Sequence, residues 1–78
     1  MELGWWNRDA EGKKFQVHLE VFGGKLLWRC QRKRHEAWQE YPPTEEDWVT
    51  ALELAENRLQ RRLTTYAMVA KIRRRDLS

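Results

Sequence analysis

The sequence is poor in residues that cross-link small proteins. Cys30 is the only cysteine among 78 residues, so an intramolecular disulfide and a cysteine-rich zinc site are both excluded. We interpret Cys30 as a buried thiol that packs like a small apolar side chain. We also expect no metal and no cofactor, because His18 points to the opposite face of the sheet predicted below, so three ligands cannot meet at Cys30 and His35.

Long apolar runs are absent as well. The uninterrupted apolar runs are a few residues long, whereas a membrane-spanning helix needs roughly 20. The first six residues, MELGWW, lack the basic start and apolar run of a signal peptide. We therefore expect no transmembrane segment and a reducing, cytoplasmic location.

Motifs typical of common enzyme classes are also missing. The chain has no glycine-rich phosphate-binding loop and no H-E-x-x-H pattern. His18 and Glu20 lie two residues apart on one predicted strand, but no nucleophile has an obvious place beside them. We expect a protein that is not an enzyme and has no small-molecule substrate.

Aromatic residues, by contrast, are abundant. The chain has five tryptophans, two phenylalanines and two tyrosines. A chain of this length buries only about 60–65% of its extended surface, so large side chains are needed to fill a thin core. We expect one small domain over residues 1–78.

The stretch 15–31 predicts a β-hairpin. Two alternating runs flank Gly23-Gly24, and a Gly-Gly pair can supply the positive φ angles of a two-residue turn. The apolar cross-strand pairs then share one face, which Phe15 extends: Val21 with Leu26, Leu19 with Trp28, and Val17 with Cys30. The opposite face receives Gln16, His18, Glu20, Phe22, Lys25, Leu27, Arg29 and Gln31. A slip of one residue would expose the apolar set, so this register is strongly specified.

A strand over residues 4–8 is predicted to precede this hairpin, which has strands over 14–22 and 25–32. Two registers remain open for the first strand. A four-residue loop over 9–12 places Trp6 opposite Phe15, whereas a bulged loop pairs Trp5 with Val17. In either register one tryptophan faces the core and its neighbour faces outward.

The chain after the hairpin predicts a solvated turn and a fourth strand. The basic run Arg32-Lys33-Arg34-His35 has no apolar member. Alternation resumes over 37–41, which we interpret as an edge strand ended by Pro42-Pro43.

A helix is predicted over residues 45–63. Thr44, with Asp47 three residues on, resembles a capping box. An apolar stripe then recurs at helical spacing and is expected to cover the apolar hairpin face; its members are Trp48, Leu52, Ala55, Leu59 and Leu63.

Two outcomes remain open beyond Leu63. Strands of about eight residues span roughly 26 Å, which is the length of the predicted helix. A single long helix would therefore overhang the sheet over residues 65–75. Alternatively the helix breaks at Thr64, which would cap a second helix; this is favoured because an overhang exposes apolar surface. The predicted fold is α+β: a three- to four-stranded antiparallel meander with one long C-terminal helix, bent or broken near Thr64, on one face.

Charge is distributed unevenly along the chain. Residues 44–56 carry five acids and no base, and residues 57–75 carry seven bases and no acid. Helix polarity accounts for part of this pattern, but three consecutive arginines exceed it. Bases mixed with tryptophans on an uncovered sheet face are typical of nucleic-acid binding, although an ordinary solvated face looks similar. The candidate contacts are Lys14, His18, Arg29, Lys33, Arg34, Lys71, Arg73, Arg74 and Arg75.

An alternative hypothesis is a protein-interaction module. The apolar residues of the last predicted helix could bind a protein partner or form a homodimer, and these are Tyr66, Met68, Val69 and Ile72. The same helix could rest on an acidic membrane surface, but its apolar residues are few.

Overall fold

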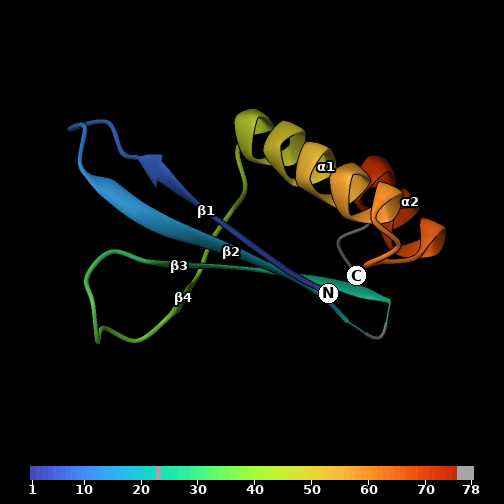
Figure 1. Cartoon of the computed structure of the whole chain (residues 1–78). Helices are drawn as coiled ribbons and strands as arrows, with labels where there is room; N and C mark the ends of the chain where they lie inside the picture. The colour runs from blue at the N-terminus through green and yellow to red at the C-terminus, as the bar shows by residue number, and fades with distance from the viewer. Residues whose placement is uncertain (23, 76–78) are drawn as a thin grey trace.

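The computed structural model describes residues 1–22 and 24–75. Four strands are followed by two helices (Figure 1). The elements are β1 (Glu2–Arg8), β2 (Lys14–Phe22), β3 (Lys25–Gln31), β4 (Gln39–Glu40), α1 (Glu45–Gln60) and α2 (Tyr66–Arg74). The strands form one antiparallel sheet in the order β1-β2-β3-β4. The α+β class and the meander are therefore confirmed.

The central hairpin has the predicted register. Val17 lies opposite Cys30, Leu19 opposite Trp28, and Val21 opposite Leu26. All six side chains are buried, as is Phe15. Because strand side chains alternate between faces, this single register fixes which side of the sheet is dry.

Strand β1 adopts the second of the two registers left open. Trp5 pairs with Val17 and points toward the core, while Trp6 is 65% exposed. The strand also begins at Glu2, earlier than predicted, and Leu3 adds a buried side chain to the core.

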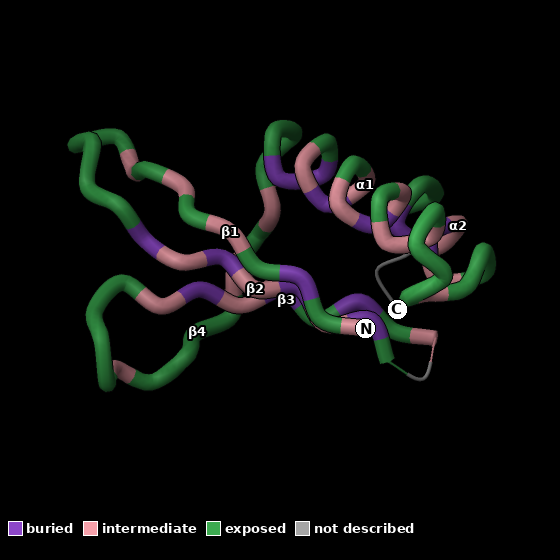
Figure 2. Tube along the Cα trace, viewed as in Figure 1, coloured by how far each residue is buried: buried purple, intermediate pink, exposed green. Residues whose placement is uncertain are grey.

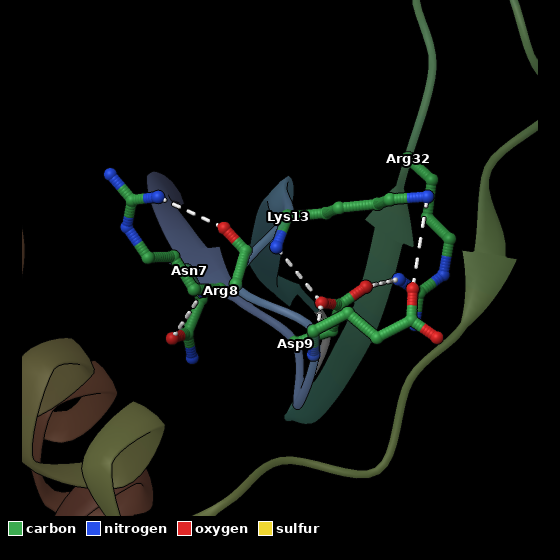
Figure 3. A network of polar contacts seen from close by, with 7 residues as sticks. Asn7, Arg8, Asp9, Lys13 and Arg32 are labelled. Atoms are coloured by element: carbon green, nitrogen blue, oxygen red, sulfur yellow. Dashed lines mark hydrogen bonds and ion pairs between the residues drawn. The ribbon is translucent and has the colours of Figure 1, made fainter.

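The β1–β2 turn is held by one carboxylate (Figure 3). Asp9 accepts hydrogen bonds at 2.9 Å from the backbone amides of Lys13 and Glu11, and these bonds, that from Lys13 first, lower its pKa. Gly12 closes the turn at φ 80°, in the left-handed region that glycine enters at little cost. Arg32 donates to Asp9 at 3.0 Å and lies over the Phe15 ring, so this arginine is not the freely solvated residue that we expected.

Strand β4 is shorter than the predicted 37–41 range. It comprises Gln39 and Glu40, which pair with Cys30 and Arg29. The Tyr41 amide adds one more bond, to the Trp28 carbonyl at 3.2 Å. Pairing ends there because Pro42 has no amide hydrogen to donate.

Helix α1 begins with the predicted capping box. The Thr44 hydroxyl accepts from the Asp47 amide, and the Asp47 carboxylate accepts from the Thr44 amide. The buried side of the helix is made by Trp48, Ala51 and Ala55. The predicted apolar stripe ends before Leu63, which is 64% exposed.

The prediction of one long C-terminal helix is wrong, because α1 and α2 are separate. Helix α1 ends in a Schellman-type arrangement: the Leu63 amide bonds to the Arg58 carbonyl at 2.8 Å, and the Arg62 amide to the Leu59 carbonyl at 3.0 Å. Arg62 occupies the left-handed position at φ 60°. Thr65, one residue after the predicted cap, then accepts from the Met68 amide and starts α2.

The reason for the break is burial. Val69 and Ile72 of α2 are 0% and 1% exposed, within the same core as the hairpin residues. A continuous helix would carry both side chains past the end of the sheet. Turning back places them against the core instead, and this apolar burial favours the two-helix arrangement.

The core is one layer between sheet and helices (Figure 2). Trp28 lies at its centre, in edge-to-face contact with Trp5 and Trp48 at centroid distances of 5.8 and 5.0 Å. The helices cover only part of the sheet: the β1–β2 turn and the β3–β4 loop project beyond them (Figure 1).

Candidate nucleic-acid interface

One face of the sheet is not covered by the helices, and we call it the open face. It is formed by residues that alternate with the core positions. These are Glu2, Gly4, Trp6 and Arg8 of β1, Lys14, Gln16, His18, Glu20 and Phe22 of β2, and Lys25, Leu27, Arg29 and Gln31 of β3.

Exposed aromatic rings are the most unusual feature of the open face. Trp6 is 65% exposed and Phe22 68%. Trp38, from the loop before β4, is 40% exposed, and its ring centroid lies 5.6 Å from that of His18. Large aromatic side chains normally gain stability by burial, so two exposed tryptophans on one uncovered face indicate a contact surface.

A shallow groove runs beside Trp38. It has a volume of about 940 Å³ and lies along the edge of β3 and the segment leading to α1. Leu27 and Arg29 line it from the sheet, and Pro42 and Pro43 line it from the segment. Its lining is largely apolar, with Arg29 and Glu40 as its charged members, and it extends the surface that Trp38 offers.

Two of the predicted open-face contacts already have acidic partners. Arg29 lies 3.4 Å from Glu20, and Glu40 sits opposite it in the sheet. The His18 imidazole lies 3.7 Å from the Glu2 carboxylate. The middle of the open face is therefore balanced in charge rather than basic. The sequence did not predict that Glu40 faces Arg29, because nothing in it sets the register of so short a strand.

Three predicted contacts remain exposed near the uncovered end of the sheet. Lys14 begins β2, and Lys33 and Arg34 lie in the β3–β4 loop. Within residues 1–22 and 24–75, none of these three side chains forms an ion pair. They are the cations best placed to attract an anionic ligand.

The basic C-terminal segment makes ion pairs with α1, and its arginines remain exposed to solvent. Arg75 makes a bidentate contact with Glu45 at 2.5 and 2.7 Å and lies over the Trp48 ring. Arg73 pairs with Glu56 at 3.2 Å. Lys71 and Arg74 also have interaction partners. These contacts show that Arg73 and Arg75 are balanced by acids of α1; that the four bases contact nucleic acid stays a prediction.

The predicted partner stripe on α2 is largely internal. Val69 and Ile72 are buried in the core, so the folded domain does not offer them to a partner. Met68 is partly buried and accepts a contact from the Thr64 hydroxyl. Tyr66 alone of the four is well exposed, at 67%.

A buried carboxylate joins the sheet to α1, and sequence reasoning assigned it only a capping role. Asp47 is 0% exposed and accepts hydrogen bonds from the Trp5 indole at 3.1 Å, the Asn7 amide at 2.9 Å and the Tyr41 hydroxyl. Burial alone would raise the pKa of Asp47, but its hydrogen bonds, from the Thr44 amide first, lower it overall. Burial and the adjacent Asp47 raise the pKa of Tyr41 well above its ordinary value, so the phenol remains a donor. Because its carboxylate oxygens already accept these hydrogen bonds, Asp47 stabilises the fold and is not available to a ligand.

Comparisons with known proteins give no family. No family model, no curated protein and no solved structure matches the chain. Among the described residues, no helix is long and apolar enough to cross a bilayer.

Proposed function

We propose that this chain is a non-catalytic domain that binds single-stranded nucleic acid on its open face. The observation that carries the proposal is the exposure of Trp6 and Trp38 on the side of the sheet away from the helices. Unpaired bases stack on exposed aromatic rings at about 1–3 kcal/mol per base, whatever the base identity.

The proposed phosphate contacts come from the uncovered end of the sheet. Lys14 begins β2, two residues before Gln16, which pairs with Trp6, and Lys33 and Arg34 lie in the β3–β4 loop that also carries Trp38. Such contacts position a ligand without reading its sequence. His18, beside Trp38, adds a second flat ring to the surface.

A single-stranded ligand fits this surface better than a duplex. Paired bases in a duplex keep their faces stacked on one another, so exposed rings cannot reach them. A single strand can turn its bases onto the rings while its backbone runs past the cations. The proposal therefore assigns Trp6 and Trp38 to stacking, and Lys14, Lys33 and Arg34 to the backbone.

Substitution of the two tryptophans tests the proposal. Trp6→Ala and Trp38→Ala should each weaken binding of a labelled random single-stranded oligonucleotide by about 5- to 100-fold, the loss of one stacked base. Fluorescence anisotropy at low salt measures this loss. Tyr66→Ala is the matched control, because Tyr66 is as exposed as Trp6 but lies on α2; its affinity should equal that of the wild type.

Two results would contradict the proposal. One is a wild-type chain that binds neither single-stranded DNA nor RNA at low salt. The other is an affinity that falls as much in Tyr66→Ala as in the tryptophan variants.

A further inference from the structure

The outer edge of β1 has hydrogen-bonding groups without partners in the sheet. β1 is a terminal strand of the sheet formed by the described residues. The Val21 amide bonds to the Met1 carbonyl at 2.8 Å, and the Asp9 amide to the Lys13 carbonyl at 3.0 Å. Since antiparallel pairing alternates, the odd-numbered residues of β1 bond to β2. The amides and carbonyls of Glu2, Gly4, Trp6 and Arg8 therefore point outward.

Apart from the charges of Glu2 and Arg8 near its ends, this edge lacks the features that usually protect a terminal strand. β1 pairs with β2 over seven consecutive residues without a bulge, and it contains no proline and no lysine. Gly4 is exposed, so the backbone at the middle of the strand is accessible. Long, regular edges of this kind add strands from other chains unless charge or shape prevents it.

We propose that a second copy of this chain pairs with the β1 edge in antiparallel orientation, about a two-fold axis at Trp5. This register overlaps all seven residues of β1. It places Glu2 opposite Arg8 of the second copy, Gly4 opposite Trp6, and Trp5 opposite its own equivalent. The outward-facing residues pair with one another, as backbone bonding across the new junction requires. The Arg8 amide, which already bonds to the Asn7 side chain at 2.8 Å, marks the end of the new ladder.

Charge complementarity is the first argument for this partner. Within one chain Glu2 faces Glu20 across the sheet, and like charges opposite each other are unfavourable. The ion-pair contact that Glu2 makes among the described residues is with the His18 imidazole, at 3.7 Å. Arg8 donates to the Gly12 carbonyl and, among the described residues, pairs with no acid. The two-fold pairing supplies both residues with opposite charges, twice per dimer.

Gly4 is the second argument. Glycine inside a strand is unfavourable and often marks close approach of another group. The single chain gives no reason for it: Gly4 does not have a positive φ, and an added Cβ would lie 3.6 Å from the Val17 carbonyl oxygen, an ordinary contact. In the proposed dimer the Trp6 indole of the second copy packs over Gly4, a cross-strand arrangement known to compensate glycine in sheets.

The dimer would have one continuous eight-stranded sheet. The open faces of both copies would lie side by side, with both Trp6 side chains near the axis. This inference goes beyond the proposed nucleic-acid binding and does not depend on it.

Charge reversal tests the dimer directly. Glu2→Arg and Arg8→Glu each place like charges opposite one another, so each should raise the dimer dissociation constant about tenfold or more. An equimolar mixture of the two variants restores both opposite-charge pairs and should form heterodimers. The double variant should self-associate like the wild type. Sedimentation equilibrium from about 10 µM to 1 mM measures the association of the two single variants, their mixture and the double variant. Glu53→Arg, an exposed acid on α1, is the matched control and should leave association unchanged.

Gly4→Val separates dimerisation from folding. A β-branched residue should stabilise the monomer's strand, while its side chain occupies the space assigned to Trp6 of the second copy. The variant should therefore unfold at a higher temperature than the wild-type monomer and dimerise more weakly, because the Trp6 ring of the second copy can no longer lie against the Gly4 backbone.

Three results would overturn the inference: a wild-type chain that stays monomeric throughout the concentration range, single charge reversals that associate as the wild type does, or a mixture that remains monomeric. Nucleic-acid titration of the same variants is a separate measurement, so failure of either proposal can be recognised independently of the other.

Discussion

At the scale of single residues, Asp47 connects more of the molecule than any other polar side chain described above. Its carboxylate joins Trp5 and Asn7 of β1 to Tyr41 and to the start of α1. The capping role of Asp47 was predictable, because Thr44 lies three residues before it. The long-range donors were not, since no local pattern relates residues 5 and 7 to residue 47.

Replacing this carboxylate should be costly. Asp47→Asn keeps the size of the side chain but presents an NH₂ group to donors, so buried hydrogen bonds are lost. We expect the free energy of unfolding to fall by about 1–3 kcal/mol, measured by urea denaturation. Glu46→Gln, an exposed neighbour in the same helical turn, should change it little.

The same residue predicts how stability depends on pH. The pKa of Asp47 is lowered in the folded chain, whereas an unfolded aspartate titrates near pH 3.9. The stabilisation is therefore complete at neutral pH and is lost as the pH falls below about 4 toward the folded-state pKa. Thermal unfolding followed from pH 7 to 2 should show a smaller acid loss in Asp47→Asn than in the wild type. Equal acid loss in both would mean that other carboxylates control it.

At the scale of elements, strands and helices with a regular apolar period could be predicted from the sequence, but the residues at which they begin and end could not. The hairpin register followed from Gly23-Gly24 and the alternating apolar residues, and it is confirmed. The start of β1 was missed by two residues: the predicted strand begins at residue 4, whereas β1 begins at Glu2. The end of α1 was misplaced because residues 60–65 contain neither glycine nor proline; burial of Val69 and Ile72, a tertiary effect, decides it.

The junction between the helices gives a prediction of its own. Arg62 holds a left-handed conformation at φ 60°, where a side chain costs energy and glycine does not. Arg62→Gly should therefore raise the free energy of unfolding by about 0.5–1 kcal/mol. Gln60→Gly, two residues earlier and still helical, should lower it by about 1 kcal/mol. If both variants lose stability equally, the left-handed position is not strained.

At the scale of the whole molecule, the distribution of charge along the sequence was a poor guide to which residues form the candidate site. The sequence separates acids from bases along the chain, but the fold brings α2 against α1 and pairs Arg73 and Arg75 with Glu56 and Glu45. Which bases remain unpaired depends on tertiary structure; among the candidate nucleic-acid contacts of the described residues they are Lys14, Lys33 and Arg34, near the uncovered end of the sheet. The aromatic part of the site was easier to anticipate, because alternation alone places Trp5 and Trp6 on opposite faces.

Salt dependence measures how many bases engage a ligand. With Lys14, Lys33 and Arg34 as the phosphate contacts, the logarithm of affinity for single-stranded DNA should fall with the logarithm of salt concentration at a slope near −2. Lys14→Ala should reduce the slope by about 0.7, whereas Arg73→Ala should leave it unchanged. A slope near −5 in the wild type would mean that the bases of α2 leave their acidic partners and take part.

The hydrophobic core contains residues from both the first strand and the last helix. Leu3 from the first strand and Ile72 from the last helix are almost fully enclosed in the same cluster. Neither the hairpin nor the helices can complete that cluster separately, so partial unfolding from either terminus removes support from everything between. The domain should consequently melt in one cooperative step, with tryptophan fluorescence and backbone circular dichroism reporting the same midpoint.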